Sequence, residues 1–204
     1  MKNITTIAAA ILATALAVTA AEGLRPLMIG EEIPDLKLKD SGGKEIRLRA
    51  VAEEQPLVLI FYRGSWCPYC NLHLAQLQKI DPQLRGLGYR IIAISPDLPE
   101  NLKTSIDKNE LTYTLLSDST MAAAKAFGLA FTVDDTTLTK YAEYGIDLES
   151  ASGEKHHMLP VPAVFLVGTD GVVDFVYANP DYKKRIDSEV LLAAAKAAMG
   201  SNGE

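Results

Sequence analysis

Two cysteines, Cys67 and Cys70, are the only ones in this chain of 204 residues, and two residues separate them. An apolar run at 57–62 leads to the pair, and apolar residues continue beyond it at Leu72, Leu74, Leu77 and Ile80. The pattern predicts a buried strand that turns into a helix at the cysteines. In the first turn of a helix the two sulfurs lie close enough for a disulfide bond. Free N–H groups and the positive end of the helix dipole favour a thiolate there, so the spacing predicts thiol–disulfide exchange.

The sequence leaves two other uses of the pair open. A zinc site needs about four ligands, and only His73, His156 and His157 are available to complete one. A purely structural disulfide between Cys67 and Cys70 would close too short a loop to stabilise the fold much, because that benefit grows with loop length. A redox-active pair is therefore the favoured interpretation, with no metal and no cofactor.

The first 21 residues have the pattern of a signal peptide. Lys2 precedes an apolar run, and small residues at 18–21 are followed by Glu22. An uncleaved membrane anchor is the alternative, which the length of the run barely permits. We expect cleavage, a periplasmic or otherwise exported protein, and a single domain formed by residues 22–204. An oxidising compartment suits a chain whose only cysteines form a pair.

Composition narrows the range of partners. The formal net charge is −6, and no cluster of Lys and Arg with interleaved aromatic residues occurs. Nucleic acid is therefore not an expected partner, and no membrane contact is expected after signal cleavage.

Hydrophobic periodicity and turn residues predict an α/β fold. Strands are expected at 33–39, 46–48, 57–62, 89–95, 113–116, 163–167 and 172–177. Helices are expected from the cysteines to about Leu84, and at 99–109, 119–127, 136–144 and 187–199. Residues 49–55 are expected to form a short helix or a loop. The first two strands and the last two form hairpins. The order in between predicts a central, mainly parallel sheet with helices on both faces.

With Cys67 and Cys70 after the first core strand and Pro162 just before a hairpin, the chain resembles the thioredoxin fold. From about Ile29 to Arg185 it also resembles the peroxiredoxin-like branch of the AhpC/TSA family. The matching stretches are 61–64 (FYRG), 94–96 (ISP), 116–118 (LSD), 126–128 (AFG), 144–148 (YGIDL), 159–163 (LPVPA) and 180–182 (PDY). The resemblance implies an antioxidant oxidoreductase that is recharged by a thioredoxin-type donor.

One of the four family site positions matches the family pattern and three depart from it. Cys70 falls where peroxiredoxins place the cysteine that attacks peroxide. Cys67 takes the place of a Thr or Ser, Arg63 that of a Pro, and Pro162 that of a distant Arg. The groups replaced normally bind the peroxide and stabilise the thiolate. The substitutes resemble thioredoxin, in which the first cysteine attacks and a cis-proline faces it.

The candidate site residues follow from this comparison. We expect Cys67 to be the more exposed and more acidic thiol and the nucleophile, with Cys70 packed behind it as the resolving partner. The family pattern alone reverses these two roles.

Around the thiols, Trp66 either docks substrate or packs. Arg63 lends positive charge to the thiolate, although a solvated arginine is the simpler expectation. A cis bond between Val161 and Pro162 is expected to present backbone to a substrate strand.

Three functions are compatible with the sequence. The first is an exported, peroxiredoxin-like enzyme that reduces hydroperoxides or disulfides through Cys67 and Cys70. The second is an exported protein thiol–disulfide oxidoreductase without peroxidase activity. The third is a copper-handling chaperone that uses the cysteines with His156, His157 and Met158.

Overall fold

The computed structural model of the protein describes residues 23–201, so the predicted signal peptide lies outside the described residues. The strands are β1 (Lys37–Asp40), β2 (Glu45–Arg47), β3 (Leu57–Phe61), β4 (Arg90–Ser95), β5 (Thr114–Ser117), β6 (Ala130–Thr132), β7 (Met158–Pro160), β8 (Ala163–Val167) and β9 (Val173–Ala178). The helices are α1 (Leu48–Glu54), α2 (Pro68–Gly86), α3 (Pro99–Asn109), α4 (Ala122–Ala126), α5 (Asp135–Glu143), α6 (Leu148–Ser152) and α7 (Ser188–Ser201).

Seven strands form one mixed sheet in the order β2-β1-β5-β4-β3-β8-β9. Pairing is parallel only at its centre, where β4 lies between β3 and β5. The outer strands pair antiparallel, with the N-terminal hairpin on one side and the β8–β9 hairpin on the other. The predicted mixed α/β fold with an N-terminal hairpin is confirmed. The expectation that the sheet is mainly parallel is wrong, because only two of its six strand pairings in the described residues are parallel and both hairpins add antiparallel ones.

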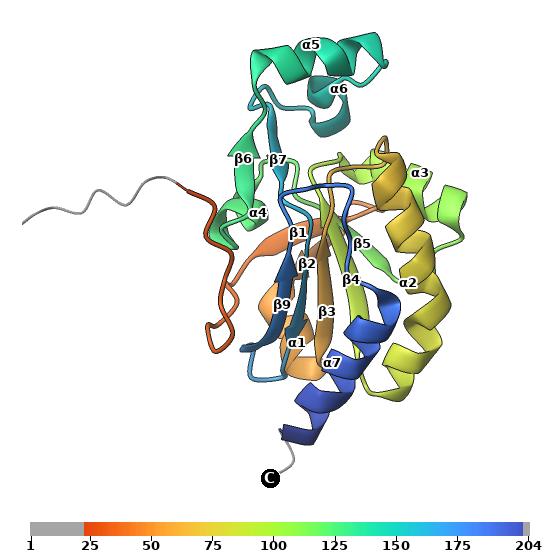
Figure 1. Cartoon of the computed structure of the whole chain (residues 1–204), viewed down its shortest axis with the longest axis vertical. Coiled ribbons are helices and arrows are strands. Elements are labelled where there is room, and N and C mark those ends of the chain that lie inside the picture. Colours follow the sequence, from red (N-terminus) through yellow and green to blue (C-terminus); the bar gives the residue numbers. More distant parts are fainter. Residues whose placement is uncertain (1–22, 202–204) are drawn as a thin grey trace, which may run out of the picture.

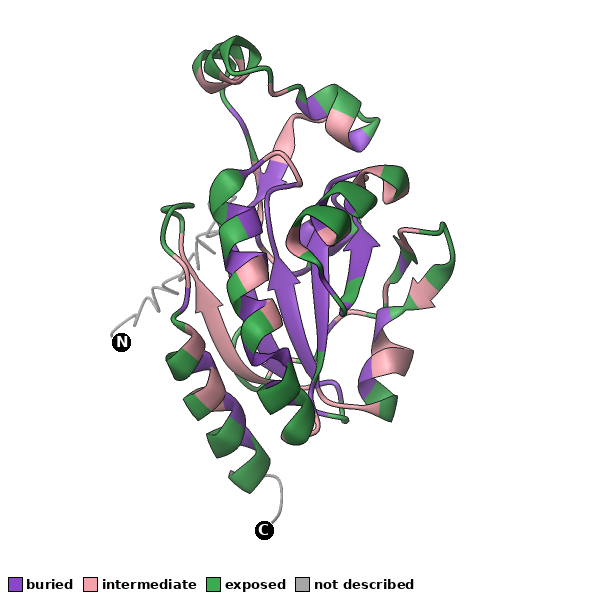
Figure 2. Cartoon of the chain, turned by 90° about the vertical axis from the view of Figure 1, so that its right-hand side faces the viewer, coloured by how far each residue is buried: buried purple, intermediate pink, exposed green. Residues whose placement is uncertain are grey.

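Alternation along β3 divides the core between the two faces of the sheet. Val58, Ile60 and Tyr62 pack with α2, α3 and α7 on one face. Leu57, Leu59 and Phe61 pack with α1 and α4 on the other. All six are buried, and Figure 2 shows the centre of the sheet as buried. Each fully buried large apolar side chain contributes about 1.5–3 kcal/mol. Because β3 is covered on both faces, its end is held firmly, and the cysteines follow directly from it.

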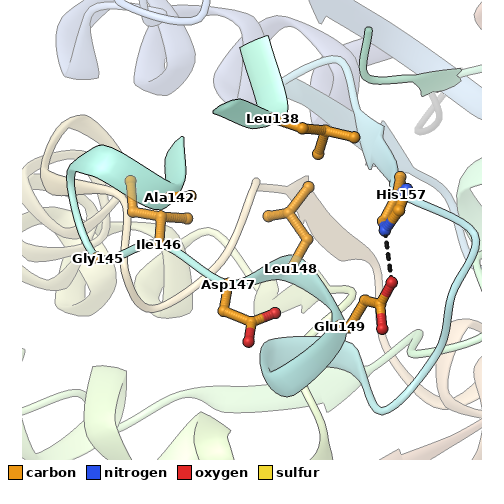
Figure 3. Close-up of a pocket in the computed structure, with 8 residues that line it drawn as sticks. All are labelled: Leu138, Ala142, Gly145, Ile146, Asp147, Leu148, Glu149 and His157. Atoms are coloured by element: carbon orange, nitrogen blue, oxygen red, sulfur yellow. Dashed lines mark hydrogen bonds and ion pairs between the residues drawn. The ribbon is translucent and has the colours of Figure 1, made fainter. Parts of the chain in front are cut away.

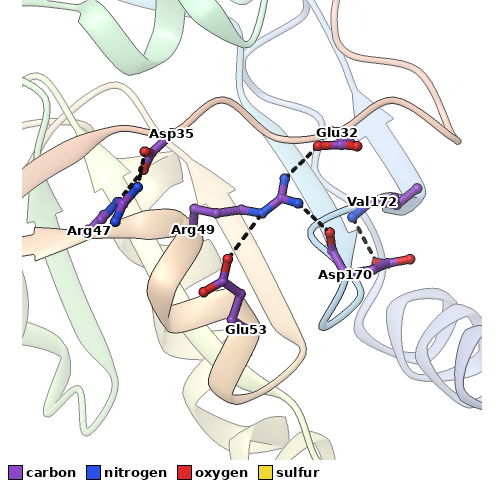
Figure 4. Close-up of polar contacts among 7 residues, drawn as sticks. All are labelled: Glu32, Asp35, Arg47, Arg49, Glu53, Asp170 and Val172. Carbon is purple, nitrogen blue, oxygen red and sulfur yellow. Dashed lines mark hydrogen bonds and ion pairs between the residues drawn. The ribbon is translucent and has the colours of Figure 1, made fainter.

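Ion pairs and hydrogen bonds attach the segment before β1 to β2 and α1, and attach α1 to the β8–β9 turn. Arg49 donates from Nη1 to Glu32 at 3.0 Å and from Nη2 to the Asp170 carbonyl at 2.7 Å (Figure 4). Arg47 donates from Nε to Asp35 at 2.8 Å. These contacts join the first residues of the described chain to α1 and to the β8–β9 turn.

One helix is shorter than the sequence pattern predicts, and three short elements were missed. The Asp118 carboxylate accepts the N–H groups of Ala123 and Ala124, both at 2.8 Å, and Met121 has φ +61, so α4 begins only at Ala122. Strands β6 and β7 form a separate two-stranded ribbon of three residue pairs, too short for an alternating pattern to be recognised. The same applies to α6, which has five residues.

Residues 134–157, which we call the arm, carry α5 and α6 on the β6–β7 ribbon. The arm stands away from the main sheet, above the end at which α2 begins (Figure 1). No helix within residues 23–201 is long and apolar enough to cross a membrane.

Gly128 is expected to be essential for packing of the N-terminal segment. Its φ is +67, and an added Cβ would lie 1.7 Å from the carbonyl oxygen of Arg25. Gly128→Ala should therefore lower the free energy of unfolding by at least roughly 1–3 kcal/mol. Gly86→Ala is the matched control, since that glycine ends α2 in open space, and alanine there should add roughly 0.5–1 kcal/mol. Urea unfolding measures both; equal stabilities would contradict the described contact.

Candidate active site

Both thiols lie at the start of α2, as the sequence predicts. Cys67 is the residue that caps the helix, with Pro68 in its first position. The carbonyl of Cys67 accepts the N–H groups of Cys70 and Asn71, both at 3.1 Å. Pro68 fits this position because its missing N–H would have no partner inside the helix.

Both thiols are buried, and the expected difference in their exposure is very small. Cys67 is only 1% exposed and Cys70 is fully buried, and both are free thiols. The predicted order of acidity agrees with the structure. A hydrogen bond from the Cys70 side chain lowers the pKa of Cys67 to about 6, against the effect of burial, with help from the Cys70 backbone, Arg63 and Arg185. Burial raises the pKa of Cys70 well above its ordinary value, and the hydrogen bond with Cys67 adds to this.

Arg63 is buried rather than solvated, which corrects the simpler expectation for it. It is 3% exposed, and its guanidinium carbon lies 3.9 Å from the ring centre of Tyr182, 5.1 Å from that of Trp66 and 5.5 Å from that of Tyr141. Its Nη2 donates to the Tyr141 hydroxyl. Three aromatic faces therefore hold the cation beside the thiols and compensate part of its lost hydration.

Arg185 is a second cation at the site, and sequence reasoning missed it. Its Nη2 lies 3.4 Å from the sulfur of Cys70. Tyr182, three residues earlier, also packs against Tyr69 of α2, with ring centres 5.8 Å apart. The only signal in the sequence was that the family pattern includes residues 180–182 and runs as far as Arg185.

The arm reaches the site through Tyr141. Its ring lies 5.6 Å from that of Trp66, which is half-buried and also packs against the core around α2. Leu138 and Ile146 of the arm belong to the small cluster that contacts Trp66. The packing role expected for Trp66 is therefore present, and one segment of the arm joins the cysteine loop.

The predicted cis bond before Pro162 is wrong. No peptide bond within residues 23–201 is cis. The Val161 N–H donates to the Leu129 carbonyl at 2.8 Å, and the Pro162 carbonyl accepts from Asn179 at 3.1 Å. These backbone groups are already paired within the protein, so they do not offer an edge to a substrate strand. Pro162 instead forms part of the wall of a pocket that Arg63 also lines.

A buried carboxylate fixes the loop between β3 and the cysteines. Asp97 accepts from the Ser65 N–H at 2.7 Å and from the Ser95 hydroxyl at 3.0 Å. Gly64 has φ +143, and a Cβ there would lie 2.4 Å from Nε1 of Trp66. The loop therefore needs both the glycine and the aspartate to bring Trp66 and Cys67 into place.

A second pocket lies entirely within the arm. It has a volume of about 520 Å³ and is lined by residues of α5, α6 and the segment before β7 (Figure 3). His157 and Glu149 face each other across it, with Nε2 and Oε1 2.8 Å apart. Neither cysteine lines it, so we place the chemistry at the thiols, where the charge and the nucleophile are.

The histidines and the cysteines do not form a metal site together. His156 contacts the Ser119 carbonyl at 2.8 Å, whereas His157 contacts Glu149. Within residues 23–201 no three His, Cys, Asp or Glu side chains are grouped so as to hold a metal ion.

Asp97→Asn should change how stability depends on pH. Burial raises the pKa of Asp97 from 3.8 to about 6, against the hydrogen bonds from Ser65 and Ser95. The folded state therefore favours the protonated acid. This contribution is complete below about pH 3.8 and is lost as the pH rises through about 6. The stability of Asp97→Asn relative to the wild type should rise between pH 4 and 7 in urea unfolding.

Asp147→Asn is the control for that experiment. Asp147 is exposed, and hydrogen bonds from Ser150 lower its pKa below 3.8. Its removal should produce no comparable rise above pH 4. A flat difference curve for Asp97→Asn would mean that its carboxyl group ionises as it does in the unfolded chain.

Known proteins with similar sequences are peroxiredoxins. A putative peroxiredoxin bcp of Haemophilus influenzae is 32% identical over 106 residues, which cover 52% of this chain and 68% of that one. Peroxiredoxin Bcp of Escherichia coli is 30% identical over 106 residues and has 67% of its length covered.

Solved structures agree on the fold. Peroxiredoxin Q of Xanthomonas campestris superposes with a TM-score of 0.65 at 24% identity, covering 84% of this chain and 98% of that one. Peroxiredoxin 6 of Arenicola marina gives a TM-score of 0.72 at 15% identity, covering 87% and 76%. The predicted thioredoxin-like architecture is therefore confirmed.

The family profile that matches the chain is that of AhpC/TSA, and the match extends over residues 29–176. It includes β3, the cysteine loop, α2 and the whole arm. The chain belongs to the AhpC/TSA family.

Proposed function

We propose that the protein is a thiol peroxidase of the peroxiredoxin type in which Cys67 attacks the oxidant and Cys70 resolves the product. The observation that carries this proposal is the difference between the two thiols. Cys67, at the N-terminal end of α2, has its pKa lowered to about 6, whereas that of Cys70 is raised well above the ordinary value. At neutral pH the pair therefore holds one thiolate and one thiol, the state that a two-cysteine reaction needs.

The reaction proceeds in two steps. The Cys67 thiolate attacks the terminal peroxide oxygen, the O–O bond breaks, and the leaving oxygen takes a proton to become an alcohol or water. Cys67 is then a sulfenic acid. The Cys70 sulfur attacks the Cys67 sulfur and loses its proton, and a disulfide and water form. The Arg185 guanidinium, 3.4 Å from Cys70, stabilises negative charge on that sulfur as the proton leaves.

The burial of the thiols favours a small oxidant. Only 1% of Cys67 is exposed, so a protein disulfide reaches it only after the surrounding residues move, whereas a peroxide needs much less room. A protein thiol–disulfide oxidoreductase remains the second candidate. Cys67, Arg63 and Pro162 stand where the family pattern places its peroxide-binding groups.

A thioredoxin-type dithiol is the proposed reductant of the Cys67–Cys70 disulfide. One donor thiolate attacks the disulfide and forms a mixed disulfide, which releases one cysteine. The second donor thiolate then attacks the donor sulfur of the mixed disulfide, which releases the other cysteine and leaves the donor oxidised. Support comes from a yeast mitochondrial 1-Cys peroxiredoxin of the same fold, whose thiol is resolved through glutathione and thioredoxin systems. No cofactor is needed for either half of the cycle.

We further propose that the protein is exported and acts in the periplasm or an equivalent compartment. The support is the N-terminal pattern of Lys2, an apolar run and small residues up to Ala21. Expression of the full chain should yield a secreted form that begins at about Glu22, which mass spectrometry of the extracellular or periplasmic fraction would identify. A full-length protein confined to the cytoplasm would contradict export and leave the proposed thiol chemistry unaffected.

Replacement of each cysteine should separate the two roles. Cys67→Ser should abolish peroxide turnover and leave a thiol that is alkylated slowly near pH 7. Cys70→Ser should keep the fast, acidic thiol, consume one equivalent of peroxide and accumulate a sulfenic acid that dimedone traps. Stopped-flow fluorescence of Trp66, the only tryptophan, with hydrogen peroxide and with a model protein disulfide identifies the faster oxidant. A fast, acidic thiol in Cys67→Ser would show that Cys70 attacks.

A further inference from the structure

The pocket next to Arg63 has the lining of a small-molecule site. Its volume is about 270 Å³, larger than the roughly 150 Å³ cavity that holds benzene in an engineered protein. Apolar and aromatic side chains line it from the β6 strand, the arm, the start of β8 and the segment after β9. The chief contributors are Phe131, Val133, Tyr141, Pro162, Pro180 and Tyr182.

Arg63 is a buried cation that lacks an anionic partner. In the part of the chain that the structure describes, no carboxylate oxygen lies within 4 Å of it. Its Nε is buried without a hydrogen-bond acceptor, and Nη2 reaches only the neutral hydroxyl of Tyr141. Aromatic faces compensate part of the cost of burying the charge, but a buried cation is normally paired with an anion.

The one acidic residue at the pocket does not fill this role. Asp134 is exposed and caps α5, with its carboxylate accepting the Thr137 N–H at 2.9 Å and the Thr137 hydroxyl at 2.7 Å. Arg185 offers no alternative, because it is a second cation with no carboxylate within 4 Å in the described residues. The site thus combines positive charge, an unused donor and an apolar cavity.

We propose that this pocket binds the carboxylate of a small organic anion, with Arg63 as its counter-ion and the rings of Tyr141 and Tyr182 beside its apolar body. Guanidinium suits this task because its fork of donors matches a carboxylate. Resting on the proposed function, the consequence is a preference for oxidants that carry a carboxylate, because such molecules are held at Arg63, which lies in the same loop as Cys67. Neutral oxidants of the same size lack this anchor.

Binding can be tested without any redox chemistry. Benzoate and its neutral analogue benzamide are titrated into the Cys67→Ser protein, and Trp66 fluorescence is followed, because its ring lies 5.1 Å from Arg63. Benzoate should bind saturably and benzamide at least about tenfold more weakly. Arg63→Met should abolish the difference. Arg90→Met should preserve it, because Arg90 is an exposed arginine at the first residue of β4, at the opposite end of the sheet from the cysteine loop. Equal binding of the two probes, or no binding of either, overturns the proposal.

A second variant guards against misfolding of Arg63→Met. Thr132 is exposed at the pocket, so Thr132→Phe should fill the cavity and leave Arg63 in place. It should weaken benzoate binding by at least about fivefold while the far-ultraviolet circular dichroism stays unchanged. Full benzoate affinity in a folded Thr132→Phe protein would place the binding elsewhere and refute the pocket.

The catalytic consequence needs an assay with matched oxidants. The reduced wild-type protein is mixed with dithiobis(nitrobenzoate), which carries carboxylates, and with neutral dithiodipyridine. The ratio of the two rates cancels changes in the thiolate fraction, and it should fall at least about fivefold in Arg63→Met and not in Arg90→Met. An unchanged ratio overturns the preference. Slow reaction with both reagents alongside intact benzoate binding would refute the proposed thiol function and leave the anion site standing.

Discussion

Two guanidinium groups lie beside the sulfurs of Cys67 and Cys70, and this concentration of positive charge is the constraint around which the site is built. Neither Arg63 nor Arg185 has a carboxylate within 4 Å in the described residues, although the whole chain carries a net charge of −6. The charge stabilises a thiolate at a helix N-terminus, where the backbone dipole acts in the same direction. It also requires partners that do not neutralise it, and the aromatic faces of Trp66, Tyr141 and Tyr182 supply them.

The sheet determines where these groups meet. β3 is buried on both faces and delivers Arg63 and Cys67 just beyond its carboxyl end. The neighbouring parallel strand β4 brings Asp97 to the same edge, where it binds the N–H of Ser65. Ligand sites of open α/β sheets form at this edge because the loops after adjacent strands converge there. Tyr141 of α5 and Tyr182, which follows β9, complete the site by packing against Arg63.

The sequence predicted the parts of the structure that depend on local pattern. The strand predicted at 57–62 and found at 57–61, the helix at 99–109 and the position of Cys67 at the start of α2 follow from apolar periodicity and from proline at helix starts. What it could not provide depends on contacts over long sequence distances. The burial of Cys67 and the approach of Arg185 to Cys70, 115 residues apart, are of this kind. The cis bond expected at Pro162 came from resemblance to thioredoxin, and the pairing of Val161 with Leu129 replaces it.

The arm is joined to the rest of the protein by the β6–β7 ribbon, by the Ala151 carbonyl, which accepts the Leu98 N–H at 2.8 Å, and by the ring of Tyr141, which packs against Trp66. Its two attachment points, Thr132 and Met158, are partners in the same ladder, so the intervening segment begins and ends at one place. Changes within it leave the strand pairs of the seven-stranded sheet in place, but they alter the surroundings of Arg63 and Trp66, because both contact Tyr141. In the proposed reaction the choice of oxidant is therefore expected to depend on residues between these two points, while the nucleophile stays at the start of α2.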